Sequence, residues 1–196
     1  HWLNRTRRVR DEELLKILRR AGGNVLYVGY ETIDDATAKQ WHKGYRGENS
    51  LAARLAEDTH ILHESGFWVH GMFIMGPQHT EQTAHNIVNF ARRNDIESLQ
   101  ISILTPFPGT PLMDEMCPHL ILRDFPADWD YFDGSHCVYG HSRLGVDRMM
   151  KVLLEAHRRF YQIGGWSMQR LHNMLKQPLS LWDKMAGLWR SARIAK

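Results

Sequence analysis

Three short segments of the chain place polar side chains or tight turns directly after an apolar run. They are 29–32 (GYET), 73–77 (FIMGP) and 103–111 (ILTPFPGTP). Because open parallel α/β sheets bind ligands at the carboxyl ends of their strands, these three ends together predict a binding site. Glu31 is the first candidate, since a carboxylate at the end of a buried strand needs a hydroxyl or ammonium partner. The alternative is a structural carboxylate that caps the following helix.

The second and third segments predict turns of restricted geometry. Gly76-Pro77 followed by Thr80 indicates a tight turn before a helix, where backbone N–H groups can bind an anion or a flat ring can lie against the main chain. The run from Thr105 to Pro111 surrounds Gly109 with prolines, which fixes a rigid turn at the exit of a strand.

The elements that must position these segments follow from the hydrophobic pattern. We expect strands over 24–30, 67–75 and 99–104, and helices over 11–20, 34–44, 50–65 and 80–94. The run NVLYVGY at 24–30 has so little polar content that it predicts a strand buried on both faces. Alternating helices and strands with short connections indicate a parallel βα architecture, although three such units cannot close a barrel.

Beyond Thr105 the pattern changes. Prolines and the aromatic residues Trp129, Tyr131 and Phe132 predict an irregular cover, and further helices are expected over 146–163 and 179–194. We therefore divide the chain into a βα unit over 1–116 and a cover with a helical extension over 117–196.

Charge is unevenly distributed although the chain carries only +3 in total. Residues 21–140 carry −9, and the two ends together carry +12. A basic tail can bind nucleic acid or an anionic membrane surface, and an apolar stripe over 181–189 beside basic residues could lie on a membrane. The simpler interpretation is a solvated or self-packed helix face.

Two cysteines and several paired histidines do not form a metal site in the sequence. Cys117 and Cys137 are twenty residues apart, so we expect unpaired thiols in a reducing cytoplasm. The pairs His60/His63 and His136/His141 lack a third ligand, which favours ordinary surface or hydrogen-bonded histidines. The longest apolar stretch, 67–77, is shorter than the roughly 18 residues of a membrane span, and the start at His1 shows no signal-peptide pattern.

Taken together, these segments resemble the second half of the barrel of radical S-adenosylmethionine (radical SAM) enzymes. The matching stretches are VGYETIDDATAKQWHKG at 28–44, HESGFWVHGMFIMGPQHTEQTAHNIVNFAR at 63–92 and SLQISILTPFPGTPLMDEM at 98–116. The segment WDYFDGSHCVYGHSRLGVDRMMKVLLEAHRRFY at 129–161 is similar to the region after the barrel in the cobalamin-binding type of these proteins.

The resemblance implies a partial (βα)6 barrel without its first three strands. In this family S-adenosylmethionine lies across the strand ends and chelates a four-iron four-sulfur cluster, which a Cys-x3-Cys-x2-Cys loop holds. Reduction by an electron donor then yields a 5′-deoxyadenosyl radical, or supports methyl transfer, and cobalamin stays open as a further cofactor of the longer protein.

Carried over to this chain, the resemblance assigns roles to residues at the strand ends. Glu31 would contact the ribose or methionine part of S-adenosylmethionine. The adenine pocket would be lined from the two later strands by Ile74, Met75, Gly76, Ser102, Leu104 and Thr105, with a rim at 108–110. Lys43 and Arg46 would meet the cofactor carboxylate or an anionic substrate, or would simply be exposed to solvent.

The chain also departs from the family pattern. It contains no Cys-x3-Cys-x2-Cys, and Cys117 and Cys137 cannot replace a loop that supplies three thiolates. We therefore expect a fragment of a radical SAM enzyme that is inactive alone, acting on a substrate that the sequence does not identify. Two alternatives stay open: a βα binding module whose basic ends dock on nucleic acid or membrane, and a βα enzyme that binds a phosphorylated ligand at 76–80 without iron.

Overall fold

Three parallel strands form the centre of the computed structural model, which describes residues 9–42, 49–140 and 143–162. The strands are β1 (Val25–Glu31), β2 (Trp68–Met75) and β3 (Ser98–Ile103), and they lie side by side in that order. Tyr27 is in register with His70 of β2, and His70 with Ser98 of β3. The expected parallel βα architecture is confirmed for this part of the chain.

Helices connect the strands at the expected places, although the helix expected over 34–44 ends at Gln40. α2 (Glu12–Arg20), α3 (Asp35–Gln40), α4 (Leu51–Glu64) and α5 (Glu81–Arg93) precede or follow the strands in alternation. Their starts have polar caps, because Asp11, Asp34 and Ser50 each accept a hydrogen bond from a backbone N–H in the first turn. The positive φ of Gly66 allows α4 to end directly before β2.

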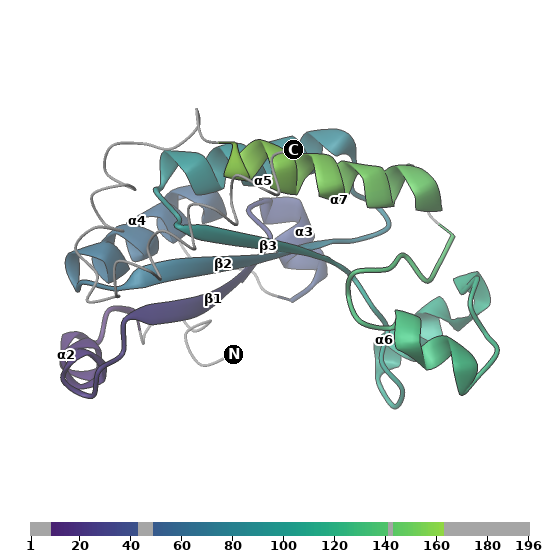
Figure 1. Ribbon diagram of the computed structural model, residues 1–196, viewed down its shortest axis with the longest axis horizontal. Coiled ribbons are helices and arrows are strands. Elements are labelled where there is room, and N and C mark those ends of the chain that lie inside the picture. Colours follow the sequence, from purple (N-terminus) through teal and green to yellow (C-terminus); the bar gives the residue numbers. More distant parts are fainter. Residues whose placement is uncertain (1–8, 43–48, 141–142, 163–196) are drawn as a thin grey trace.

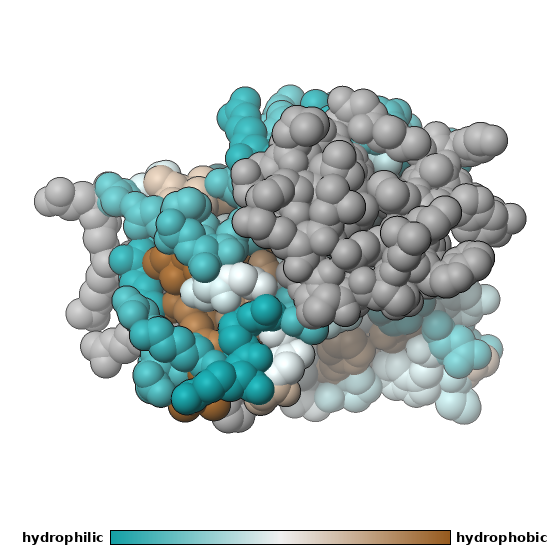
Figure 2. All heavy atoms as spheres, turned by 60° about the vertical axis from the view of Figure 1, so that its left-hand side comes forward, coloured by the Kyte–Doolittle hydropathy of each residue, from teal (hydrophilic) through white to brown (hydrophobic). Residues whose placement is uncertain are grey.

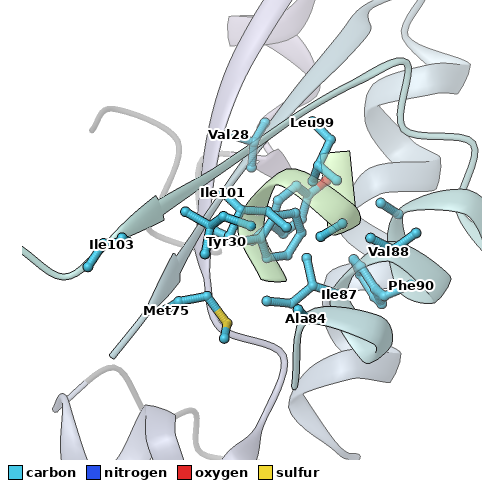
Figure 3. Close-up of a cluster of buried hydrophobic side chains, with 14 of the residues drawn as sticks. Val28, Tyr30, Met75, Ala84, Ile87, Val88, Phe90, Leu99, Ile101 and Ile103 are labelled. Carbon is cyan, nitrogen blue, oxygen red and sulfur yellow. The ribbon is translucent and has the colours of Figure 1, made fainter. Parts of the chain in front are cut away.

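One face of the sheet carries the hydrophobic core. Figure 1 shows α4, α5 and α7 (Val146–Tyr161) on the same side of the strands, and α7 packs against both α5 and β3. Side chains from the strands and from α5 meet in the buried cluster of Figure 3, which includes Val28, Phe90 and Ile101. The helix α7 belongs to the second predicted unit, yet it packs against the first one. The division of the chain into two units at residue 116 stays a prediction.

The opposite face of the sheet corrects one expectation. β1 is not buried on both faces, because Val25 and Tyr27 are exposed while Val28 and Tyr30 are buried. Successive side chains along each strand point alternately to the core face and to the opposite face, called the open face because no described helix packs on it. This alternation is typical of strands covered on one side. The low polar content of 24–30 misled the interpretation, since an exposed tyrosine and valine look the same in sequence as buried ones.

The segment after β3 is partly helical and lies beyond the carboxyl ends of the strands (Figure 1). α6 (Pro111–Met116) begins at the N-cap Thr110, and short 3-10 turns follow at Cys117–His119 and Ala127–Tyr131. The helix α6 was missed because its prolines were interpreted only as a turn, whereas Thr before Pro is also a helix-start signal. The predicted helix over 146–163 is confirmed as α7, and the one over 179–194 lies outside the described residues.

Two further observations concern the surface. At the amino ends of the strands, Figure 2 shows a small hydrophobic area framed by hydrophilic residues. Within the described ranges, no helix has the length and apolar character that crossing a membrane requires. Each basic end lies in part outside the described residues, over 1–8 and over 163–196, so the interpretation of these ends stays a prediction.

Candidate functional site

The carboxyl ends of the three strands meet at one edge of the sheet, as the sequence predicts. The backbone continues the pairing there, because Leu104 N donates to Met75 O at 2.8 Å. At the end of β1 the register shifts between Gly29 and Glu31, and Glu31 has a φ of +62°. A bulge with a left-handed residue redirects a side chain, so the carboxylate of Glu31 is placed differently from a regular strand residue.

The residues predicted to line the adenine pocket separate into three groups. Ile74 and Ser102 are half-buried on the open face of the sheet, where they are in register with each other. Met75 is fully buried among core side chains beside α5 (Figure 3), and Thr105 is buried with its hydroxyl donating to Ile103 O. The Met75 side chain therefore faces the core and not this edge of the sheet.

Of the remaining two, Leu104 lines a cavity described below, and Gly76 directly precedes the lining residue Pro77. The predicted substrate ligands are not part of the described structure. Lys43 and Arg46 fall in the range 43–48, which the structure does not describe. Their assigned role therefore stays a prediction, as do the roles of Glu31 and of the pocket residues.

A buried histidine, which the sequence interpretation missed, shapes the turn after β2. His79 is 4% exposed, and its Nδ1 accepts a hydrogen bond from Gly76 N at 2.9 Å. Because Nδ1 must then carry no proton in the neutral ring, Nε2 carries it and donates to the Thr37 hydroxyl at 3.2 Å. The His79 ring also lies 5.6 Å from the ring of Trp41. This side chain joins the turn after β2 to α3, and the Gly-Pro-x-His spacing was the available signal.

The same turn is poorly suited to the phosphate alternative. Gly76 N is already bonded to His79, and Thr80 N donates to the hydroxyl of Thr83 at 3.2 Å in a capping box. The first residue of α5 is also acidic, and its carboxylate would repel an anion. These backbone donors serve the fold, which weakens the proposal of a phosphate site at 76–80.

A cavity of about 670 Å³ opens beside this turn. Its size falls in the range of small-molecule pockets, roughly 300 to 1,000 Å³. It lies between the end of α3, the turn after β2, the exit of β3 and the segment from α6 onward, and it is lined by Gln40, Trp41, Pro77, Gln78, Leu104, Leu112, Glu115, Met116, His119, Tyr139, Gly140 and Arg143. The cavity mixes apolar walls with amide, phenol and charged groups, as a site for a polar cofactor does.

Tyr139 is the most unusual residue of the cavity. Its side chain is fully buried, and its hydroxyl has no hydrogen-bond partner in the part of the chain that the structure describes. Burial raises the pKa of Tyr139, so the hydroxyl stays protonated and available as a donor. A bridge between Leu120 and Tyr139, reinforced by Gly140 N donating to His119 O at 2.9 Å, fixes the backbone. A buried hydroxyl without a partner calls for an explanation, and Tyr139 is one of the residues that line the cavity.

The cysteines and histidines have structural roles. Cys117 is exposed and Cys137 is buried, both as free thiols, and burial raises the pKa of Cys137. His63 pairs with Glu97 at 3.2 Å, and His136 with Asp133 at 3.1 Å, so the expectation of hydrogen-bonded histidines is confirmed for them. Across ranges 9–42, 49–140 and 143–162, no three metal-ligating side chains gather. The residues present therefore do not fit an iron–sulfur cluster, which needs three thiolates.

Comparison with known proteins finds relatives whose names describe methyl transfer. No family model matches the chain. It is 28% identical over 160 residues to bacteriochlorophyllide d C-12(1)-methyltransferase of Chlorobaculum tepidum, which covers 81% of this chain and 33% of that protein. It is 26% identical over 134 residues to bacteriochlorophyllide d C-8(2)-methyltransferase of the same organism, covering 68% and 29%.

A more distant relative has a name of the same kind. The chain is 28% identical over 105 residues to hopanoid C-2 methylase of Rhodopseudomonas palustris, covering 53% of this chain and 19% of that protein. The chain thus spans a third or less of the length of these relatives. It is similar to proteins named as methyltransferases or methylases.

Proposed function

We propose that this chain is the carboxyl-terminal part of a radical SAM methyltransferase and that it contributes half of the S-adenosylmethionine site. Two independent observations support the proposal. The three motif-bearing strand ends meet at one edge of a parallel sheet, and the relatives are named for methyl transfer. The choice of S-adenosylmethionine as the cofactor rests on the resemblance of the segments over 25–116 to the radical SAM barrel.

The cavity beside the strand ends carries the proposal. S-adenosylmethionine, when bound, supplies the methyl group or the radical precursor. The Tyr139 hydroxyl, which lacks a partner among the described residues, would donate to an acceptor atom of this ligand, and Trp41 and Leu104 supply apolar walls. Glu31 at the bulge would accept hydrogen bonds from hydroxyl or ammonium groups.

The iron–sulfur cluster belongs to a different part of the proposed protein. Neither cysteine of this chain fits it, since one is buried and hydrogen-bonded to Tyr139 O and the other lies alone on the surface. The ligands would come from sequence upstream of His1, and cobalamin, if used, would be held elsewhere as well. The residues of this chain would therefore bind and orient S-adenosylmethionine. Its reduction through the iron–sulfur cluster is assigned to the upstream part of the protein.

The hydrogen bonding at the two outer edges of the sheet favours its being part of a larger barrel. The outer edge of β3 is already occupied, because Tyr161 and His157 of α7 hydrogen-bond to backbone groups of Leu99 and Ile101. The outer edge of β1 pairs with no strand among the described residues, and Tyr27 on it is 63% exposed. Further strands can be added only beside β1, which is where the first half of a barrel would attach.

The proposal is tested in two forms of the protein. The reading frame extended upstream of His1 should, after anaerobic reconstitution with iron and sulfide, show the visible absorption of a cluster and cleave S-adenosylmethionine. The variant Glu31→Ala should lose cleavage while keeping the cluster absorption, whereas the exposed control Glu13→Ala should keep both. An extension that forms no cluster and cleaves no cofactor would overturn the proposal.

The 196-residue chain provides the second test. Calorimetric titration should detect S-adenosylmethionine binding that Tyr139→Phe weakens about five- to tenfold, since one hydrogen bond to a buried donor is lost. Cofactor binding of equal strength in Tyr139→Phe would place the ligand outside this cavity.

A further inference from the structure

One wall of the cavity is in contact with a buried side chain that does not itself line the cavity. Trp41, Pro77 and Gln78 belong to this wall, and His79 is not among the described residues that line it. His79 is 4% exposed, and its ring lies 5.6 Å from the Trp41 ring. A ligand in the cavity would therefore meet Trp41, and His79 could act on that ligand through Trp41.

The position of Trp41 depends on the spacing between α3 and the turn after β2. Trp41 is the C-cap of α3, and its backbone N–H donates to Thr37 O at 2.9 Å. A Cβ added at Gly76 would lie 3.1 Å from Trp41 Cζ2, so the indole packs directly on the backbone of a residue without a side chain. A change in the spacing between α3 and this turn would therefore move the indole.

His79 fixes this spacing with one hydrogen bond on each side of its ring. Gly76 N donates to Nδ1 at 2.9 Å, and Nε2 donates to the Thr37 hydroxyl at 3.2 Å. Both partners are buried, so loss of either bond leaves a polar group without a ready substitute from water. Since Thr37 also accepts the hydrogen bond of Trp41 N, a continuous series of contacts runs from the turn to the indole.

We propose that His79 is a positioning residue for S-adenosylmethionine binding, which holds the Trp41 indole as a fixed wall of the cavity. The proposal rests on the proposed function, since that function places this ligand in the cavity. A wall that is fixed before binding loses less conformational entropy when the ligand binds than a mobile wall does. The imidazole suits this role because its two nitrogens, held in one rigid ring, accept from the turn and donate to α3.

Two substitutions break the same bond from opposite sides. In His79→Asn the amide oxygen can still accept from Gly76 N, but the shorter side chain does not reach Thr37. Thr37→Val keeps the shape of the side chain and removes its hydroxyl. Each variant of the 196-residue chain should bind S-adenosylmethionine about five- to tenfold more weakly in calorimetric titration, because one hydrogen bond that holds the wall is lost. The double variant should bind no more weakly than either single variant.

A third substitution separates positioning of Trp41 from general support of the fold. Trp41→Leu removes the indole, so the addition of His79→Asn to this variant should weaken S-adenosylmethionine binding no further. A general effect of His79 on the fold would weaken binding by the same factor with either residue at position 41. His60→Asn, the same substitution at an exposed histidine of α4, is the control and should bind as the unmodified chain does.

The indole N–H resonance of Trp41 provides a measurement that needs no ligand. It is identified in the NMR spectrum by its loss in Trp41→Leu. The resonance should shift in both His79→Asn and Thr37→Val, because each variant releases the contact between α3 and the turn. It should stay unchanged in His60→Asn.

Three results would overturn the proposal: unchanged binding in His79→Asn and Thr37→Val, a further loss when His79→Asn is added to Trp41→Leu, or an unmoved Trp41 resonance. Each of them leaves the proposed function standing if the unmodified chain binds S-adenosylmethionine. Absence of binding by the unmodified chain would instead contradict the proposed function. The Trp41 resonance would then still decide whether His79 positions the indole.

Discussion

Replacing Tyr161 by Phe removes one oxygen atom that serves both backbone groups of Leu99. In the structure Leu99 N donates to this hydroxyl at 3.0 Å, and the hydroxyl donates to Leu99 O at 3.1 Å. His157 bonds Ile101 N at 3.2 Å one turn earlier on α7. These side chains cover the outer edge of β3, where a further strand would otherwise pair.

The expected loss comes from the groups left without a partner. Leu99 is 3% exposed, while Tyr161 is half-buried, so water can replace part of the hydroxyl's hydrogen bonding. Each unsatisfied buried group costs roughly 1–3 kcal/mol, and partial hydration places the total for Tyr161→Phe at about 1–2 kcal/mol. For a chain of this size that lowers the melting temperature by about 2 to 8 °C.

Urea denaturation and thermal melting of Tyr161→Phe measure this loss, with Tyr131→Phe as the control. Tyr131 is exposed, so its hydroxyl contributes little and the control should match the unmodified chain. Hydrogen exchange of the Leu99 amide should accelerate in Tyr161→Phe alone. Equal stability together with unchanged protection of that amide would refute the view that α7 closes the edge of the sheet.

Three further predictions concern the cavity and the open face. Without ligand, Tyr139→Phe should melt at the same temperature or higher, because its hydroxyl has no partner among the described residues; a loss above about 1 kcal/mol would contradict this. In Gly76→Ala the new Cβ would lie 2.8 Å from Gln78 Oε1 and 3.1 Å from Trp41 Cζ2, so urea denaturation should show a loss of about 1–2 kcal/mol. Because burial lowers the pKa of His70 below its usual 6.5, the unfolded chain takes up the proton first, and stability should fall as pH drops below 6.5. Measured against pH, His70→Gln should lose this part of the decline, and an unchanged slope would contradict the assignment.

The sequence determined the elements and their order, because hydrophobic period and capping are local properties. The strands at 24–30, 67–75 and 99–104 were predicted within one or two residues of β1, β2 and β3. The helices expected over 34–44 and 50–65 begin one residue after Asp34 and Ser50, which cap them, and the second ends at Glu64. Parallel pairing followed from the alternation of helix and strand, since such connections return each strand in the same direction.

Which face of the sheet is buried and which side chains meet were decided only by the tertiary structure. Tyr27 and Tyr30 are both aromatic residues of one strand, yet the first is exposed and the second is buried, because the helices pack on one side. Met75 was predicted to line a pocket, but its side chain points to the core face, which periodicity alone did not assign.

The most informative side chains are those whose partners lie far away in sequence. His70 meets Ser98 and Gln100 through strand register, and Tyr161 reaches Leu99 from a helix sixty-two residues later. Tyr139, whose hydroxyl has no partner among the described residues, lines a cavity only because α3, the turn after β2 and the segment from α6 onward converge there. Local pattern specifies a residue's own backbone, whereas contacts across the chain depend on how the elements pack, and no single segment of sequence contains that information.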